Sequence, residues 1–258
     1  MEVNVMKTKL FQKNLIIYEL YNTFGNFFAV FFGGIFPIVM TIIFIAAFSS
    51  QAGAFKDALA TQIFISNASM IPLALVFVGF SSTFSQELEQ GVTQRMNLFG
   101  YSNVSMLSAK LIANLIVVTI GYILYTLVVC LAFPVLAPTV FSAVLLIASL
   151  YIMTILFFVL AYGIAMLTKR FGPCYAITMT IYFSSMILSG MMGLTQEMMP
   201  APMKFLANLL PTAHIAQDFP KIWQSTSYNF MPFLQSMIFL AAVSGIVLAV
   251  ALYRNRRL

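Results

Sequence analysis

The feature that most constrains this chain is the length of its uncharged stretches. Leu111–Thr168 contains 58 consecutive residues without Asp, Glu, Lys or Arg. Before it, Leu20–Phe55 and Ala58–Gln86 are uncharged over 36 and 29 residues, and after it Phe171–Gln196 and Ile222–Tyr253 are uncharged over 26 and 32. Because a membrane-spanning helix needs roughly 20 apolar residues, the pattern predicts a polytopic membrane protein.

The composition excludes two large classes of protein. Of the 258 residues 61% are hydrophobic and only 8% are charged, whereas about a quarter of the residues of a soluble domain carry a charge. So few charges cannot cover a water-soluble globule of this size. A cytosolic enzyme and a nucleic-acid-binding domain are therefore excluded, the latter despite a net charge of +6.

The uncharged stretches divide into six predicted spans. Pro134 and Pro138 flank a short connection that splits the longest stretch in two, since proline tends to end helices. We expect an all-α membrane protein, because open sheet edges would leave backbone groups unpaired in hydrocarbon. The predicted spans are residues 28–49, 62–86, 108–133, 140–167, 174–194 and 233–253.

The basic residues predict how the chain is oriented. If both termini lie on one side, that side holds ten of the 13 Lys and Arg residues, and the other side holds Lys56, Lys204 and Lys221. Basic residues favour the cytoplasmic side, so both termini are predicted to be cytoplasmic. The positive charge then faces anionic membrane lipids, and no nucleic-acid partner is expected.

Two segments outside the spans have a recognisable character. Residues 4–25 place large apolar side chains at helical spacing, which predicts an interfacial amphipathic helix; the alternative is a basic tail that leads into the first span. The external segment 195–232 combines five prolines with many large apolar residues. We expect short re-entrant helices there, before the sixth span.

The chain offers little catalytic chemistry. It has one histidine, His214, and two cysteines without metal-ligand spacing, Cys130 and Cys174. No glycine is followed by lysine, so the phosphate-binding loop of ATPases is absent. No predicted span carries an acidic residue in its middle third, which argues against a proton relay of carboxylates.

Polar side chains recur on one face of the second predicted span and on one face of the fifth. Such faces could line a substrate pathway of moderate polarity, suited to an amphipathic cargo; the alternative is that they bond their own helices or join neighbouring ones. The candidate pathway residues are Gln62, Ser66, Ser69, Thr178, Ser185 and Ser189.

The order of these features resembles the membrane subunit of an ABC-2 type transporter, the type V ABC exporter fold. The polar stretch 86–95 reads QELEQGVTQR and is followed by Lys110, like the acidic–Gly–Thr coupling stretch and the lysine that opens span three in that family. Leu188-Ser189-Gly190 precedes a proline-bearing segment, as the family pattern requires. The chain departs from the pattern at residues 99–102, where the family often has a proline, and at Leu210-Pro211, which replaces an Asn-Pro pair.

The resemblance implies a permease subunit that moves an amphipathic or hydrophobic cargo, such as a drug, an antimicrobial peptide or a lipid-like molecule, out across a bacterial cytoplasmic membrane. It implies two copies of a separate ABC ATPase subunit, which bind ATP and Mg, and a second permease chain, identical or homologous. No cofactor or metal is expected on this chain itself, and it is not expected to be an enzyme. Within the stretch 87–103, the implied ATPase-coupling residues are Glu87, Glu89, Gly91 and Arg95; the alternative is an ordinary solvated helix end.

Two other classes remain open at this point. A non-catalytic immunity or sensor protein would have no nucleotide-binding partner. A passive channel or secondary carrier would transport without ATP, and such proteins usually carry charges within the membrane or broken-helix repeats.

Overall fold

The computed structural model describes residues 12–192, 198–224 and 229–255. Every regular element in these ranges is a helix, and six segments are long and apolar enough to cross a membrane. The predicted all-α membrane fold with six spans is therefore confirmed. These segments are Phe31–Ser49, Gly53–Glu89, Asn103–Ala132, Val140–Thr168, Phe171–Leu188 and Met231–Asn255.

The third and fourth spans are the long helices α8 (Asn103–Ala132) and α9 (Val140–Thr168). Each begins with a side-chain cap: the hydroxyl of Ser102 accepts from the Ser105 amide at 3.1 Å, and that of Thr139 accepts from the Ser142 amide at 3.2 Å. The connection between them contains the two prolines that predicted the division.

The fifth and sixth spans are α10 (Phe171–Leu188) and α14 (Met231–Asn255). Helix α10 begins and ends earlier than the expected range 174–194. Only Lys169 and Arg170 separate α9 from α10. The chain can turn within two residues because Lys169 adopts a left-handed conformation, with φ of 53°, that ends α9.

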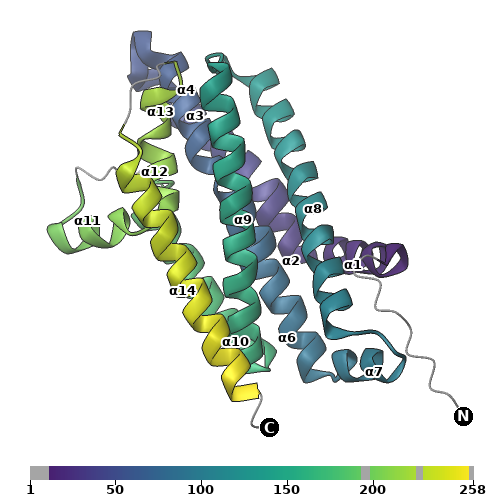
Figure 1. Ribbon diagram of the computed structural model, residues 1–258. Helices are drawn as coiled ribbons and strands as arrows, with labels where there is room; N and C mark the ends of the chain where they lie inside the picture. Colours follow the sequence, from purple (N-terminus) through teal and green to yellow (C-terminus); the bar gives the residue numbers. More distant parts are fainter. Residues whose placement is uncertain (1–11, 193–197, 225–228, 256–258) are drawn as a thin grey trace, which may run out of the picture.

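The second span is the centre of the bundle (Figure 1). It is built from α4 (Lys56–Ala68), α5 (Met70–Pro72), η3 (Leu73–Phe80) and α6 (Ser81–Glu89), and almost all of it is buried within this one chain. A helix that is apolar on every side is expected to be surrounded by other helices. The other spans therefore pack around it.

Two π-helical segments lie where the first two spans meet. The first span consists of α2 (Phe27–Val30), the π-helical η1 (Phe31–Ile35) and α3 (Phe36–Ala52), and η3 is also π-helical. A Cβ atom added to Gly79 would lie 2.6 Å from the Cβ atom of Ala29. The two backbones approach so closely there that only glycine fits at position 79.

Hydrogen bonds inside the bundle link the first three spans. The Thr41 hydroxyl in α3 lies 3.0 Å from the Tyr125 hydroxyl in α8 and accepts from the Asn67 amide in α4 at 2.9 Å. Tyr125 also donates to the carbonyl oxygen of Phe64 at 2.8 Å, and the two rings stack. All of these polar groups are buried, so each needs the partner that it has.

The segment before the sixth span forms three short helices, α11 (Ala201–Asn208), α12 (Pro211–Gln217) and α13 (Phe219–Ile222). Residues 195–197 and 225–228 of the expected re-entrant segment lie outside the described residues. Helix α12 is buried against α4 and α14. The Trp223 indole donates to the Leu136 carbonyl oxygen at 2.7 Å, which ties this segment to the connection between α8 and α9.

Helix α1 (Lys13–Gly25) lies across the bundle and packs against α8 (Figure 1). The expected interfacial helix covered residues 4–25, and residues 4–11 lie outside the described residues. Figure 1 places α13 at one end of the bundle and α7 (Val92–Leu98) at the other, which we call the α13 end and the α7 end.

Candidate functional site

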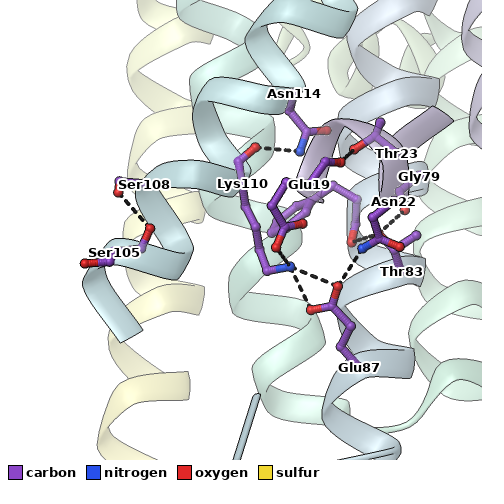
Figure 2. Close-up of polar contacts among 11 residues, drawn as sticks. Glu19, Asn22, Thr23, Gly79, Thr83, Glu87, Ser105, Ser108, Lys110 and Asn114 are labelled. Carbon is purple, nitrogen blue, oxygen red and sulfur yellow. Dashed lines mark hydrogen bonds and ion pairs between the residues drawn. The ribbon is translucent and has the colours of Figure 1, made fainter. Parts of the chain in front are cut away.

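Three helices meet at one lysine near the α7 end (Figure 2). The ammonium group of Lys110 in α8 donates to Oε1 of Glu19 in α1 at 2.7 Å. It also donates to both carboxylate oxygens of Glu87 in α6, at 2.7 and 2.9 Å. Because an ammonium group has three N–H donors, this lysine is fully used in joining α1, α6 and α8.

A second contact joins α1 directly to α6. Asn22 lies one turn after Glu19, on the same face of α1, and its amide donates to Oε1 of Glu87 at 2.7 Å. We call Glu19, Asn22, Glu87 and Lys110 the charged cluster. Figure 2 shows all four side chains pointing toward one another from their three helices.

The charged cluster is buried and carries more negative than positive groups. Glu19, Glu87 and Lys110 are 6%, 9% and 6% exposed, and the Phe84 ring centroid lies 5.7 Å from the ammonium. Burial raises the pKa of the Glu19 carboxyl, and the Glu87 charge adds to this rise, while the Lys110 ammonium opposes it. Removing the Lys110 charge would leave two carboxylates without a counter-ion in a low-dielectric site.

Glu89 connects α6 to a fourth helix. Residues two positions apart on an α-helix are rotated by about 200° about its axis. Glu87 and Glu89 therefore point to opposite sides of α6. Oε2 of Glu89 accepts from the Phe171 amide, the first N–H of α10, at 2.8 Å. The carboxylate thus satisfies a donor that the helix leaves unpaired at its N-terminus.

A sharp turn follows these residues and leads into α7. Gly91 has φ of 69°, in the left-handed region that favours glycine, and α7 begins at the next residue. Arg95 in α7 is exposed, and its guanidinium donates to the carbonyl oxygen of Gln90 at 3.2 Å. Leu98 and Phe99 are 87% and 77% exposed, which leaves two large apolar side chains at the tip of the molecule.

Helix α7 does not pack tightly against the charged cluster. A cavity of about 150 Å³ lies between them, with Thr93 and Met96 of α7 on one side and Glu19, Glu87 and Lys110 on the other. Beyond the cavity, Met96 packs against the small apolar group that holds α1 to α8. A displacement of α7 therefore reaches α1 and α8 through their packing.

The four predicted coupling residues lie in one segment but have different surroundings. Glu87 is inside the charged cluster with Lys110, Glu89 contacts α10, Gly91 forms the turn, and Arg95 faces outward. Sequence reasoning did not assign Glu19 and Asn22, which it left on the polar side of a surface helix. A signal was available, because Glu19 is the one acidic residue among residues 4–25.

The predicted pathway residues lie mostly inside the packing of this chain. Gln62 is exposed, whereas Ser66 and Ser69 are buried, and Ser66 donates to the Ala216 carbonyl oxygen of α12 at 3.4 Å. In α10, Thr178 bonds the Cys174 carbonyl of its own helix and Ser185 is buried. The Ser189 hydroxyl lies 2.6 Å from that of Thr212, also in α12. Both polar faces therefore meet α12, and their role as a pathway stays a prediction.

A second polar group lies near α12. Nδ1 of His214 is 2.8 Å from Oδ2 of Asp218, and Nε2 is 3.1 Å from the carbonyl oxygen of Asn208. The two ring nitrogens thus connect α12 to Asp218 at its own end and to Asn208 at the end of α11. Among residues 12–192, 198–224 and 229–255 no group of His, Cys, Asp or Glu is arranged to hold a metal ion.

Comparison with known proteins identifies the family. Neither a curated protein nor a solved structure is matched by the chain. The family model described as ABC-2 family transporter protein matches residues 59–253. That range covers three of the six spans completely and most of two others, and it includes the stretch with Glu87, Glu89, Gly91 and Arg95 and Lys110 of the charged cluster. This multi-pass membrane protein therefore belongs to the ABC-2 transporter family.

Proposed function

We propose that this chain is the permease subunit of an ATP-driven ABC exporter in a bacterial cytoplasmic membrane. A separate ATPase subunit binds ATP and Mg and docks at the α7 end, and two permease chains work with two ATPases. The cargo is an amphipathic or hydrophobic molecule, such as a drug, an antimicrobial peptide or a lipid. The observation that carries this proposal is the charged cluster, in which Lys110 joins α1, α6 and α8 across a small cavity from α7.

The docking surface consists of Arg95, Leu98 and Phe99. Exposed apolar side chains flanked by polar ones are typical of a protein interface. Leu98 and Phe99 are such side chains, and they lie at the end of the bundle that the distribution of basic residues predicts to be cytoplasmic. A guanidinium beside them can pair with a carboxylate of the partner. We therefore assign the contact with the ATPase to α7 and the turn that follows it.

Movement of the ATPase is transmitted by the end of the second span. Glu87 connects this end to α1 and α8, while Glu89 connects it to α10. A push on α7 therefore tilts three other helices together with α6. At the α13 end, α12 lies between the polar faces of the second and fifth spans, so its displacement would open the path.

A mild-detergent pull-down from the native membrane tests the proposal. We expect a stoichiometric soluble subunit with a phosphate-binding loop and ATP hydrolysis in the eluate. The variant L98D/F99D should lose this subunit, while F55D, an equally exposed phenylalanine near the α13 end, should keep it. A folded preparation without any ATPase would instead support the immunity-protein or channel alternatives.

Replacing Glu87 and Glu89 separately by alanine tests the transmission. Both variants should still insert into the membrane and should lower transport. If both transport normally, the coupling role of these residues is wrong. If transport falls only in E87A, the contact with α10 is not part of the coupling.

A further inference from the structure

A cavity of about 870 Å³ opens on the side of the bundle, between α8, α9 and the outer part of α4. It is separate from the charged cluster and from the polar faces of the second and fifth spans. Its walls include Leu127, Cys130, Ala143 and Ile147, and Trp223 lines its rim at the α13 end. Cavities of this size are typical of sites that bind small molecules.

The walls of this cavity continue the lipid-facing surface of the protein. Ile123, Leu127 and Leu131 of α8 and Ile147 of α9 are between 54% and 81% exposed. These side chains would contact hydrocarbon in a membrane. The cavity is therefore reached from the side, from within the bilayer, by a molecule that is already dissolved in it.

The length of the cavity matches one leaflet. Its lining on α8 runs from Thr119 to Leu131, and twelve residues of α-helix rise about 18 Å. Half of the hydrocarbon core of a bilayer is about 15 Å thick. An extended acyl chain of a lipid in the leaflet at the α13 end has this length and direction.

The inner end of the cavity, away from Trp223, has few polar groups, and the hydroxyls of Thr119 and Tyr151 are already hydrogen-bonded. The Thr119 hydroxyl donates its proton to the Leu115 carbonyl oxygen at 2.7 Å. The Tyr151 hydroxyl lies 2.6 Å from that of Thr119 and is therefore the donor in the contact between them. The hydroxyl of Tyr122 is buried without a hydrogen-bond partner among the described residues, and the exposed Thr126 carries the remaining hydroxyl of the wall. Apart from these few hydroxyls the lining is apolar, so an apolar occupant would cover mainly hydrocarbon side chains, and the wall offers a polar occupant little more than the Thr126 hydroxyl.

We propose that this cavity is a binding site for one acyl chain of a membrane lipid from the leaflet at the α13 end. The chain lies along α8 between Thr119 and Leu131, and the lipid headgroup stays at the rim near Trp223. This site does not depend on the ATPase. It would hold its lipid longer than the exposed faces of the bundle hold theirs, because walls on several sides contact the chain.

Photocrosslinking tests the proposal on the full chain in nanodiscs. The probe is phosphatidylcholine with a photoreactive diazirine on one acyl chain, and the crosslinked peptides are mapped by mass spectrometry. We expect residues 119–131 and 143–151 to be labelled several-fold more than the exposed face of α14. The variant A143W fills the cavity and should abolish this excess, whereas A242W, on the exposed face of α14, should preserve it.

The two native cysteines show whether each variant is folded. Cys174 is buried and Cys130 is exposed on the cavity wall, so in a folded protein a maleimide should reach Cys174 only after denaturant is added. If A143W fails this check, C130W replaces it, because an exposed wall position can be enlarged without disturbing the core. Equal labelling of α8, α9 and α14, or an excess that survives in the folded filled variant, would mean ordinary surrounding lipid and would overturn the proposal.

Discussion

The ammonium group of Lys110 lies 2.7 Å from a carboxylate oxygen of Glu87 and 2.7 Å from one of Glu19, although the three residues come from three different helices. Helix α1 is therefore attached to the second and third spans by a buried ionic contact. Such a contact adds little net stability compared with apolar packing, but the loss of its one ammonium group would be costly. This makes it suitable for holding helices in a defined arrangement.

Replacing Lys110 by methionine should destabilise the protein severely. The substitution leaves two carboxylates buried next to each other, and the loss of one partner from a buried ion pair costs about 3–5 kcal/mol. Thermal unfolding in detergent measures the effect. K56M removes an exposed lysine near the α13 end and should change little; equal behaviour of the two variants would contradict the described geometry.

Glu19 should make the attachment of α1 depend on pH. Because burial raises the pKa of the Glu19 carboxyl, the folded protein takes up this proton at a higher pH than the unfolded chain. The resulting stability is present in full below the unfolded pKa and is lost as the pH rises through the raised pKa. Hydrogen exchange of the α1 amides should therefore slow as the pH is lowered through the mildly acidic range, after correction for the intrinsic exchange rate.

The variant E19Q should remove this pH dependence. An amide oxygen can still accept from Lys110, so we expect the stability at neutral pH to change by no more than about 1 kcal/mol. At every pH measured, the protection of the α1 amides in E19Q should then equal the protection that the wild type reaches at low pH. A pH profile as steep in E19Q as in the wild type would assign the dependence to another group.

Gly79 should not accept a side chain. A valine there would place its Cβ 2.6 Å from the Cβ of Ala29, and overpacking of this kind typically costs 1–3 kcal/mol. The matched control is G34V in the first span, because nothing lies within 4 Å of a Cβ built on Gly34. Unfolding midpoints should fall for G79V more than for G34V, and the opposite order would contradict the close contact of the first two spans.

His214 should stabilise α12. The variant H214L removes both ring contacts and leaves the half-buried Asp218 with less support, which we expect to cost about 1–3 kcal/mol. Limited proteolysis of the segment 201–222 measures this loss. K221M breaks only an exposed ion pair of the same aspartate and should have little effect.

The six spans were predictable from sequence because uncharged length alone determines which segments can cross a membrane. The end of α8 and the start of α9 were also within reach, since Pro134 and Pro138 mark the connection, whereas α8 begins at Asn103 and not at the expected residue 108. The end of α10 was not, because Phe171–Gln196 is uncharged well beyond the helix end at Leu188. Uncharged residues after a span can belong to the helix or to the segment that follows it.

The charged cluster was only half predictable. Glu87 and Lys110 were selected from the resemblance, but Glu19 lies 91 residues before Lys110. An amphipathic pattern shows which side of a helix is polar, but not which other helix that side meets. For the same reason, the contacts of α12 with Ser66 and Ser189 could not be predicted from the sequence, because they depend on how distant segments pack.

The contact between α7 and an ATPase is the central claim, and crosslinking in living cells tests it most directly. A photoreactive amino acid is placed at position 98 or, as a control, at position 55, and the crosslinked partners are identified by mass spectrometry. We predict that position 98 captures a soluble subunit with a phosphate-binding loop and that position 55 does not. Capture of no ATPase at position 98 of a correctly inserted chain, or equal capture at both positions, would contradict the account.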